Sequence, residues 1–368
     1  MRIDRLTLQN FRNYEGQTIE FDPSCNVICG ENAQGKTNLL EAIVCLSVGK
    51  SPRTRSDREM IRFGEKEFLI EGGIYSRDRE FVSRIEVAEG KKKKITINRV
   101  AAKTAAELGG VLNTVFFSPE DLFLIREGAA ARRRFMDISL SQLRPRYAAA
   151  LAEYNRLLEH KTRILRDSDE HPDLLRTLPV FDARMAELGA VLIYYRARFS
   201  RILDKYAAAS HWECSGGREK LTISYQTVKT VTDPFANHAT LVSQLAEHQR
   251  SHAAAEAAVG QCLSGPHKDD LEVMLDGLSA KSFASQGQTR TAALSMKLAE
   301  REIHREIIGE YPVLLLDDVL SELDPRRQEF VLNRLGEGQV FITCCEEDRL
   351  HTMLSGKVFR ISSGKVVG

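Results

Sequence analysis

The chain has 368 residues, 43% of them hydrophobic and 28% charged, proportions typical of a folded globular protein that exclude a disordered chain. The formal net charge of +1 gives no general signal for nucleic acid, so a DNA-binding surface would have to be a local basic patch. The seven cysteines lack paired CxxC spacing and no apolar run is long enough to span a membrane, so we expect a cytoplasmic protein with reduced thiols and no membrane partner.

The two ends of the chain alternate strands and helices, whereas its middle is helical. Alternating apolar residues predict strands over 2–11 and 17–21, the apolar run 26–29 predicts a buried strand that ends at Gly30, and a helix pattern begins near Lys36. Residues 87–99 are predicted to form a hairpin that turns at Gly90. Long helical patterns fill 129–260, with a strand-like segment at 220–228 and a polar break at 166–173 that indicates a helical hairpin. We therefore expect an α/β domain assembled from 1–128 and 261–368, with a helical arm domain at 129–260.

The segment GENAQGKT, residues 30–37, fits the phosphate-loop pattern GxxxxGK[ST] between a strand and a helix. The glycines let backbone N–H groups converge on phosphates, the Lys36 ammonium reaches the terminal phosphates, and the Thr37 hydroxyl can bind Mg²⁺. A glycine turn that binds no nucleotide is the alternative. The predicted nucleotide-binding residues are Gly30, Glu31, Asn32, Ala33, Gln34, Gly35, Lys36, Thr37 and Asn38.

A second part of the site is predicted at YPVLLLDDVLSELD, residues 311–324, where four aliphatic residues precede two carboxylates. A buried parallel strand has this pattern, and α/β proteins place ligands at the C-terminal ends of such strands. Asp317 is then expected to bind Mg²⁺ through water, and Asp318 to orient or deprotonate an attacking water. The alternative is a solvated strand end without a ligand.

The polar stretch FASQGQTRT, residues 283–291, leads directly into a long amphipathic helix. A helix N-terminus carries unpaired N–H groups and a partial positive charge, so this start suits an anion such as phosphate. An ordinary helix cap is the other interpretation.

These motifs together resemble the nucleotide-binding domain of ABC-type ATPases of the SMC-like branch. LTLQNFRNYEG, GENAQGKTNLLEAI, FFSPEDL, RRRFMD, GPHKDDL and FASQGQTRTAALSMKLAE, spread over about two thirds of the chain, closely resemble the RecF family of bacterial recombination mediators. The resemblance implies an α/β fold of class ABC-type P-loop ATPase with an inserted, mainly helical arm, and it implies ATP and Mg²⁺ as cofactors. It also implies catalytic roles for Lys36 and Asp318, a signature motif that contacts the partner subunit's nucleotide, and a loop by which two subunits sense each other. The signature residues are Ser285, Gly287 and Gln288, and the sensing loop contains Ser321 and Asp324.

Three departures from the wider ABC pattern indicate slow hydrolysis, with ATP acting as a clamp. Asp318 stands where a glutamate is usual and is one methylene shorter. Thr343, Cys344 and Cys345 occupy the region of the switch histidine, and FFSPEDL offers no obvious glutamine to bind Mg²⁺.

The family resemblance further implies a weak, DNA-stimulated ATPase that forms an ATP-dependent homodimer on gapped single- and double-stranded DNA. Its implied partners are RecO and RecR, with which it would help to load recombinase, maintain replication forks and induce the SOS response. A transporter ATPase subunit would require the switch histidine and a compact helical subdomain, a metabolite kinase would work as a monomer without SQGQ, and a structural module would not bind ATP.

Basic clusters are candidate DNA contacts, because phosphate-backbone binding needs only grouped lysine and arginine. Each cluster is equally explained as a solvated charge run, and the arginines of RRRFMD could instead pair with acidic residues beside a core Phe135 and Met136. His267 and Lys268 in GPHKDDL belong either to a turn or to the functional site. The DNA candidates are Lys91, Lys92, Lys93 and Lys94, then Arg53, Arg55 and Arg58, and finally Arg132, Arg133 and Arg134.

Overall fold

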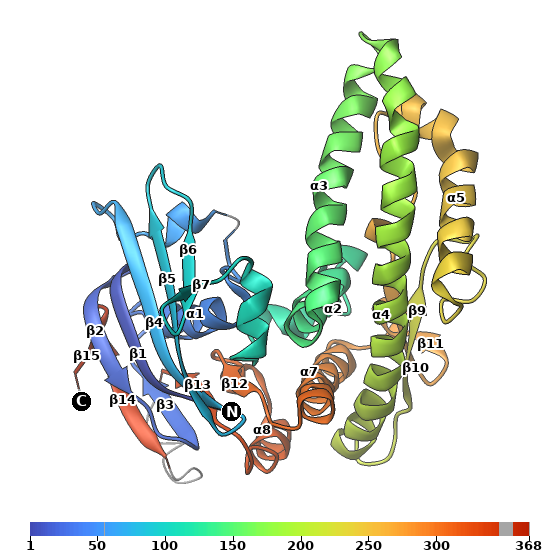
Figure 1. Ribbon diagram of the computed structural model, residues 1–368. Helices are drawn as coiled ribbons and strands as arrows, with labels where there is room; N and C mark the ends of the chain where they lie inside the picture. Colours follow the sequence, from blue (N-terminus) through green and yellow to red (C-terminus); the bar gives the residue numbers. More distant parts are fainter. Residues whose placement is uncertain (55, 346–355, 368) are drawn as a thin grey trace. The chain divides into compact units, whose positions relative to one another are not determined.

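The structure is a computed structural model that describes residues 1–54, 56–345 and 356–367, so the predicted DNA contact Arg55 lies outside the described residues. The chain divides into two compact units (Figure 1). Unit 1 contains Met1–Phe123 and Ala293–Gly368, and unit 2 contains Leu124–Ala292.

An antiparallel sheet is the first layer of unit 1. Its strand order is β2-β1-β4-β5-β6-β7, and each strand pairs antiparallel with its neighbours. Burial alternates along β4, which is typical of a sheet with one face on the core. The strands are β1 (Arg2–Phe11), β2 (Tyr14–Glu20), β4 (Glu67–Ser76), β5 (Arg79–Ala88), β6 (Lys94–Ile97) and β7 (Val100–Ala101).

The second sheet of unit 1 has the order β15-β14-β3-β13-β12-β8, and its five strands from β14 to β8 run parallel. Every residue of β3 and of β12 is buried, as expected for central parallel strands. The C-terminal ends of β3 and β12 lie at the same edge of the sheet, where the phosphate loop follows β3 and Asp317 follows β12. The strands are β3 (Cys25–Cys29), β8 (Thr114–Phe117), β12 (Val313–Leu316), β13 (Val340–Cys344), β14 (Lys357–Ser362) and β15 (Lys365–Val366).

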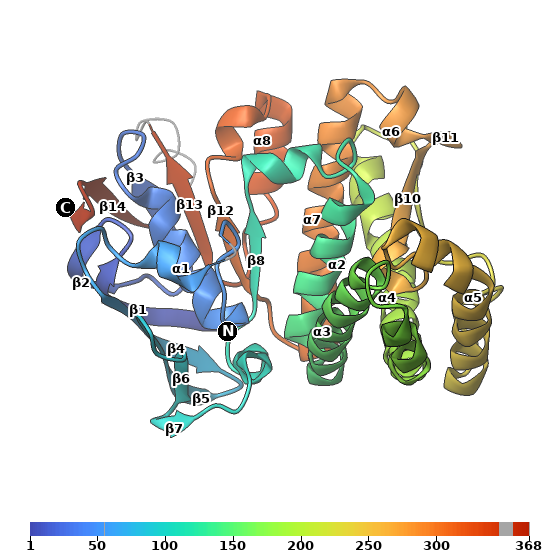
Figure 2. The same ribbon diagram turned by 90° about the horizontal axis from the view of Figure 1, so that it is seen from above.

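Helix α1 (Lys36–Val48) lies between the two sheets, where it contacts β4 and β5 on one side and β8 and β13 on the other (Figure 2). It is buried almost all round, which explains why its apolar residues show little preference for one face. The core cluster therefore joins β1 and β4 to α1, β12 and β13. Helix α8 (Pro325–Leu332) and the short helix η6 (Leu320–Glu322) connect β12 to β13.

Unit 2 is mainly helical, and its small antiparallel sheet has the order β11-β10-β9. The long helices α3 and α4 pack against each other, as do α4 and α5 (Figure 1). The elements are α2 (Ala129–Leu143), α3 (Pro145–Asp167), α4 (Leu178–Cys214), β9 (Leu221–Gln226), α5 (His238–Val259), β10 (Asp270–Leu275), β11 (Leu278–Ser279) and α6 (Ala280–Phe283). Helix α7 (Gln286–Ile308) begins in unit 2 and ends in unit 1. Among the described residues, no helix combines the length and hydrophobicity needed to traverse a bilayer.

The predicted strands at the start of the chain, the helix from Lys36 and the two long helices around the polar break are confirmed. The units divide the chain later than the predicted arm boundary at residue 260. Residues 261–292 pack within unit 2 because β10 pairs with β9 along its full length. The assignment of 261–292 to the ATPase domain remains a prediction, because a compact unit is not the same as a functional domain.

Candidate functional site

The phosphate loop is shaped by two glycines with left-handed backbone. Gly30 has φ 155° and Gly35 has φ 117°. A Cβ on Gly30 would lie 2.4 Å from the Ile361 carbonyl oxygen, and one on Gly35 would lie 2.7 Å from the Asn13 side chain. Gly30 thus requires glycine for space as well as for conformation, whereas Gly35 requires it mainly for conformation, because the end of the Asn13 side chain can shift.

The loop is fixed from two sides by hydrogen bonds to its backbone and to Gln34. Asn13 Nδ2 donates to the Gln34 carbonyl at 2.8 Å, and the Tyr14 hydroxyl donates to the Gly35 carbonyl at 3.0 Å. The backbone N–H of Ser363 donates to Gln34 Oε1 at 2.6 Å. These bonds come from the β1–β2 turn, from the first residue of β2 and from the β14–β15 turn, so the protein's own side chains and backbone hold the loop from both sides.

Lys36 is buried at the first position of α1 and is 4% exposed. Its ammonium donates to the carbonyls of Gly30 at 2.6 Å and Glu31 at 3.3 Å, and it lies 3.4 Å from Cys345 Sγ. The charge therefore lies inside the loop that would surround a phosphate. Carbonyl oxygens are weaker partners for an ammonium than phosphate oxygens are, so these bonds are ones that a phosphate could replace.

Asp317 follows β12 and is 6% exposed. Its Oδ1 accepts hydrogen bonds from Thr37 Oγ1 and from Thr343 Oγ1, both at 3.0 Å. Burial raises the pKa of Asp317, while these two hydrogen bonds act in the opposite direction. A divalent cation would stabilise this buried carboxylate, and Mg²⁺ prefers hydroxyl and carboxylate oxygens of this kind. Thr37 and Asp317 thus fit a Mg²⁺ site that phosphates and water would complete.

Asp318 has φ 51°, a left-handed backbone that is unusual for a residue other than glycine. Its N–H donates to Thr343 Oγ1 at 2.8 Å, and its carbonyl accepts from Ser321 Oγ at 2.6 Å. Thr343 therefore bonds both carboxylate residues at once. Strained backbone is retained where neighbouring structure over-determines it, and functional sites are common among such places.

A pocket of about 350 Å³ lies over the phosphate loop. Its lining residues come from the loop, from α1, from the segment after α1 and from the end of β12: Asn32, Ala33, Gly35, Lys36, Thr37, Asn38, Arg53 and Asp318. Asp318, which is far from Lys36 and Thr37 in the sequence, thus faces the same cavity as they do.

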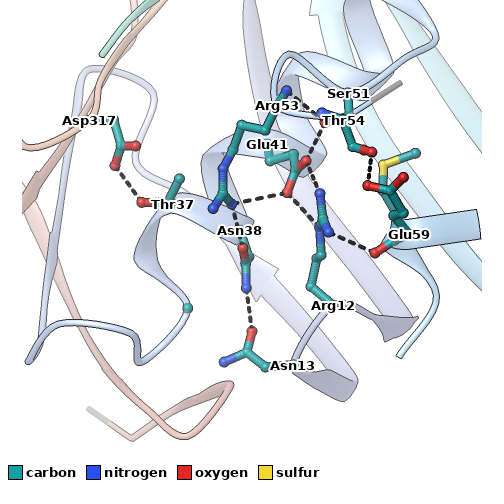
Figure 3. A network of polar contacts seen from close by, with 12 residues as sticks. Arg12, Asn13, Thr37, Asn38, Glu41, Ser51, Arg53, Thr54, Glu59 and Asp317 are labelled. Carbon is teal, nitrogen blue, oxygen red and sulfur yellow. Dashed lines mark hydrogen bonds and ion pairs between the residues drawn. The ribbon is translucent and has the colours of Figure 1, made fainter. Parts of the chain in front are cut away.

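A network around Glu41 positions two lining residues of this pocket (Figure 3). Glu41 has no exposed side-chain surface and accepts from Arg12 at 2.7 and 2.9 Å and from the Ser51 hydroxyl. Arg53 Nη1 lies 3.5 Å from Glu41 and donates to Asn38 Oδ1 at 2.9 Å. Sequence reasoning missed Glu41 and Arg12, because a lone glutamate and a lone arginine 29 positions apart give no motif.

The signature residues form the N-terminus of α7 and lie in unit 2. The N–H of Gln288 donates to Ser285 Oγ at 3.2 Å, and the N–H of Ser285 donates to Gln288 Oε1 at 2.8 Å. This reciprocal pair is a capping box, so the interpretation as a helix cap describes the local structure correctly. Gly287 is half-buried between them.

Gln288 also contacts Glu219, which is distant in the sequence but lies in the same unit, and the sequence did not reveal this contact. Gln288 Nε2 donates to Glu219 Oε1 at 3.1 Å, and Glu219 Oε2 lies 3.1 Å from His211 Nε2 near the end of α4. His211 is fully buried, and burial lowers its pKa even though Glu219 acts to raise it. The signature is thus joined to the longest helix of unit 2 by a partly buried chain of polar contacts.

The sequence of the whole chain matches a known family. A family model described as "RecF/RecN/SMC N terminal domain" matches residues 2–366. The chain is 41% identical over 368 residues to "DNA replication and repair protein RecF" of Agathobacter rectalis, covering 100% of this chain and 99% of that protein. The chain belongs to the RecF family. A RecF of Acetivibrio thermocellus is 40% identical over 348 residues, which cover 95% of this chain and 94% of that protein.

Solved structures agree with the RecF assignment. "Structure of the recombination mediator protein RecF-ATPrS in RecFOR pathway" matches with a TM-score of 0.92 and 33% identity, over 99% of this chain and 97% of that one. An Smc head domain from Pyrococcus furiosus matches with a TM-score of 0.55 at 17% identity, over 99% of this chain and 95% of that one, and shows the shared fold alone. The ABC-type ATPase fold with a helical insertion, expected from the sequence, is confirmed.

The lysine run expected to contact DNA is not uniform in this RecF-family chain. Lys91 and Lys92 are exposed beside the Gly90 turn. Lys93 instead donates to the Gly49 carbonyl at 2.7 Å and pairs with Asp57 at 2.7 Å, and Lys94 lies 3.5 Å from Glu86. Within this run, the DNA contact therefore remains a prediction that fits the exposed Lys91 and Lys92 better than Lys93.

The remaining basic candidates differ in burial. Arg58 is exposed, and Arg53 is exposed but lines the nucleotide pocket. Arg132 is 4% exposed and makes a bidentate pair with Asp270 at 2.7 and 2.9 Å, so the structural interpretation of RRRFMD applies to it. Arg133 Nη1 donates to the Asp269 carbonyl at 2.6 Å, and Arg134 is exposed. As expected, Phe135 and Met136 are core residues.

The segment GPHKDDL forms a short turn helix, η5 (Pro266–Lys268). His267 Nδ1 is 2.8 Å from the Tyr154 hydroxyl, and its Nε2 is 3.1 Å from the Cys262 carbonyl. Burial lowers the pKa of His267 to about 4. Burial thus favours the neutral form of His267, and the two contacts hold its ring within unit 2, whereas Lys268 is exposed.

The two residues of the predicted sensing loop have different local roles. Ser321 lies on η6 and contacts Asp318 through the hydrogen bond described above. Asp324 caps α8, because its side chain accepts from the N–H of Arg327 at 3.1 Å. The loop is therefore hydrogen-bonded at both ends.

Proposed function

We propose that the chain is an ATP-binding DNA repair protein whose ATP-dependent homodimer binds DNA. The observation that carries the proposal is the convergence of Lys36, Thr37 and Asp317 at one edge of the parallel sheet, beside the phosphate loop. The related structure named "RecF-ATP", at 34% identity and a TM-score of 0.89, supports ATP as the ligand.

In the proposed site, backbone N–H groups of 30–37 and the Lys36 ammonium bind the phosphates. Thr37 and Asp317 would hold Mg²⁺, which when bound neutralises phosphate charge. Asp318 is assigned to orient a water. Its side chain is one methylene shorter than glutamate and its backbone is fixed by Thr343, so we expect slow turnover that DNA stimulates.

The signature is proposed to act in trans. Ser285, Gly287 and Gln288 stand at the N-terminus of a 23-residue helix, whose dipole and N–H groups favour an anion. Nucleotide bound between two subunits would couple ATP binding to dimer formation by mass action, and hydrolysis would release the dimer. Ser321 and Asp324 are proposed to sense the partner subunit.

The proposed biological role is recombinational repair and replication-fork maintenance. The dimer would bind gapped DNA where single- and double-stranded regions meet, help RecO and RecR to load recombinase, and support SOS induction. The name of the similar structure, which places RecF in the RecFOR pathway, supports these partners.

Nucleotide binding is the first test of the proposal. Titration of the purified protein with a fluorescent ATP analogue and Mg²⁺ should give saturable binding. Lys36→Met should abolish it, and Ser285→Arg should leave binding to the monomer unchanged because the signature acts on the partner's nucleotide. Failure of the unmodified protein to bind would reject the function, and loss of monomer binding in Ser285→Arg would reject the assignment in trans.

DNA binding tests the second half of the proposal. Replacing both Lys91 and Lys92 with Glu should weaken binding to gapped duplex and reduce the salt dependence of the affinity. The matched control replaces the exposed Lys220 and Lys229 of unit 2 with Glu, which changes net charge equally. Equal loss in both variants would show that only net charge matters and that this hairpin is not the contact surface.

A further inference from the structure

Two cysteine thiols meet directly behind the phosphate loop. Cys29 ends β3 and Cys344 ends β13, and the parallel register of these strands pairs the two residues. Their Sγ atoms are 3.0 Å apart. Cys29 is 4% exposed, Cys344 is partly exposed and Cys345 is exposed. A small oxidant can therefore reach one member of the pair while the other is buried beside it.

We propose that Cys29 and Cys344 form a redox modification site. A low-molecular-weight disulfide oxidises the two thiols to an intramolecular disulfide, and the oxidised protein binds nucleotide more weakly. The effect on binding rests on the proposed function. Formation of the disulfide does not.

The backbone geometry suits a disulfide. Neighbouring strands lie about 4.8 Å apart, within the range of about 4.4–6.8 Å between the Cα atoms of disulfide-bonded cysteines. A disulfide bond is about 2.05 Å long, so the two sulfur atoms, 3.0 Å apart in the reduced protein, must approach by about 1 Å. Side-chain rotation and a small strand movement can supply that distance.

The reaction has two balanced exchange steps. The Cys344 thiolate attacks one sulfur of the small disulfide, which forms a mixed disulfide and releases one small thiolate. The Cys29 thiolate then attacks the Cys344 sulfur and releases the second small thiolate, so the protein loses two protons and two electrons and the oxidant gains them. The contact with Cys29, together with burial, raises the pKa of Cys344 well above its ordinary value, so oxidation should be slow at neutral pH and faster at alkaline pH.

Movement at this pair would be transmitted to the nucleotide site on both sides. Cys29 precedes Gly30, whose carbonyl binds Lys36 and whose backbone is packed against Ile361 with no space for a Cβ. Cys344 precedes Cys345, whose Sγ lies 3.4 Å from the Lys36 ammonium and 3.1 Å from Asn32 Oδ1. A displacement of about 1 Å in a preorganised site commonly costs a large factor, so we expect nucleotide affinity to fall about tenfold on oxidation.

The experiment treats the purified full chain with oxidised glutathione at pH 8.5 and then measures intact mass, disulfide-linked peptides and affinity for a fluorescent ATP analogue. We expect the loss of two hydrogen masses, a linkage between the peptides of Cys29 and Cys344, weaker binding, and full recovery after dithiothreitol. Cys344→Ser and Cys29→Ser should each abolish the response. Cys25→Ser, on the same strand opposite Val340, should keep it.

Three results would overturn the inference. One is a stable mixed disulfide at Cys345 with the Cys29 and Cys344 thiols unchanged. A second is a disulfide between Cys29 and Cys344 that leaves nucleotide affinity unchanged. The third is an identical loss of binding in Cys344→Ser on oxidation. If the reduced protein binds no nucleotide at all, the proposed function fails, and the mass measurement still decides whether the thiols join.

Discussion

Replacing Glu41 with glutamine removes the centre of the network beside the nucleotide pocket (Figure 3). Glu41 has no exposed side-chain surface and accepts two hydrogen bonds from Arg12, whose side chain is 20% exposed. Breaking one partner of a buried ion pair costs about 3–5 kcal/mol, because the other charge is left without compensation. Arg12 retains some contact with water, so we expect the low end, about 3 kcal/mol.

The contribution of Arg53 to this loss is small. Its closest nitrogen is 3.5 Å from Glu41, and its side chain is 48% exposed, so water screens the pair to about 0–1 kcal/mol. The loss of the Arg12 ion pair therefore accounts for most of the expected decrease in the free energy of unfolding. The freed Arg53 and Asn38 should also weaken nucleotide binding, because both line the pocket.

Native-state hydrogen exchange, measured by mass spectrometry on peptides from β1 and α1, reports the opening free energy of unit 1 directly. Tryptophan fluorescence cannot replace it, because the single tryptophan, Trp212, lies in unit 2. Glu15→Gln is the matched control: Glu15 is 69% exposed and lies 3.6 Å from Arg62, so a loss below about 0.5 kcal/mol is expected. If Glu41→Gln behaves like Glu15→Gln, the reasoning from burial is refuted.

Three further predictions follow from single contacts. Asp317→Asn should not destabilise the nucleotide-free protein, because burial disfavours the charge of Asp317, yet it should abolish Mg²⁺-dependent nucleotide binding. A sharp fall in the thermal unfolding temperature of the nucleotide-free variant would contradict this. Glu219→Ala should remove the link from Gln288 to α4 and reduce any nucleotide-induced change in Trp212 fluorescence, and an unchanged signal would exclude the link. The pKa of His267 falls from 6.5 to about 4 on folding, so its contribution to the free energy of unfolding should be fully present above pH 6.5 and should be lost as the pH falls towards 4. His267→Gln should therefore make the free energy of unfolding less dependent on pH in this range. An unaltered pH profile would show that another group titrates.

The sequence predicted the phosphate loop and Asp317 because both depend on short-range patterns. Glycine spacing around Lys36 and an aliphatic run before Asp317 are each local, and the ends of parallel strands meet at one edge of a sheet. The fold class followed from alternating strands and helices at the two ends of the chain. The 261–292 segment was harder to place, because its packing depends on the pairing of β10 with β9.

Residues whose role depends on tertiary contact could not be predicted. Thr343 bonds both Asp317 and Asp318 only because β13 pairs beside β12. Glu219 meets Gln288 across 69 positions of sequence. The lysine run gave no sign that Lys93 bonds back to the end of α1, since the four lysines look alike in the sequence.

The central claim is that each nucleotide site joins the phosphate loop of one subunit to the signature of another, and sedimentation of mixed variants tests it most directly. Lys36→Met has an intact signature and Ser285→Arg has an intact phosphate loop, so a mixture can build one complete site in each dimer. We predict that neither variant dimerises alone with ATP and Mg²⁺, whereas the mixture does and gapped DNA strengthens it. A mixture that remains monomeric while the unmodified protein dimerises, or an unmodified protein that stays monomeric with ATP and DNA, would contradict the account.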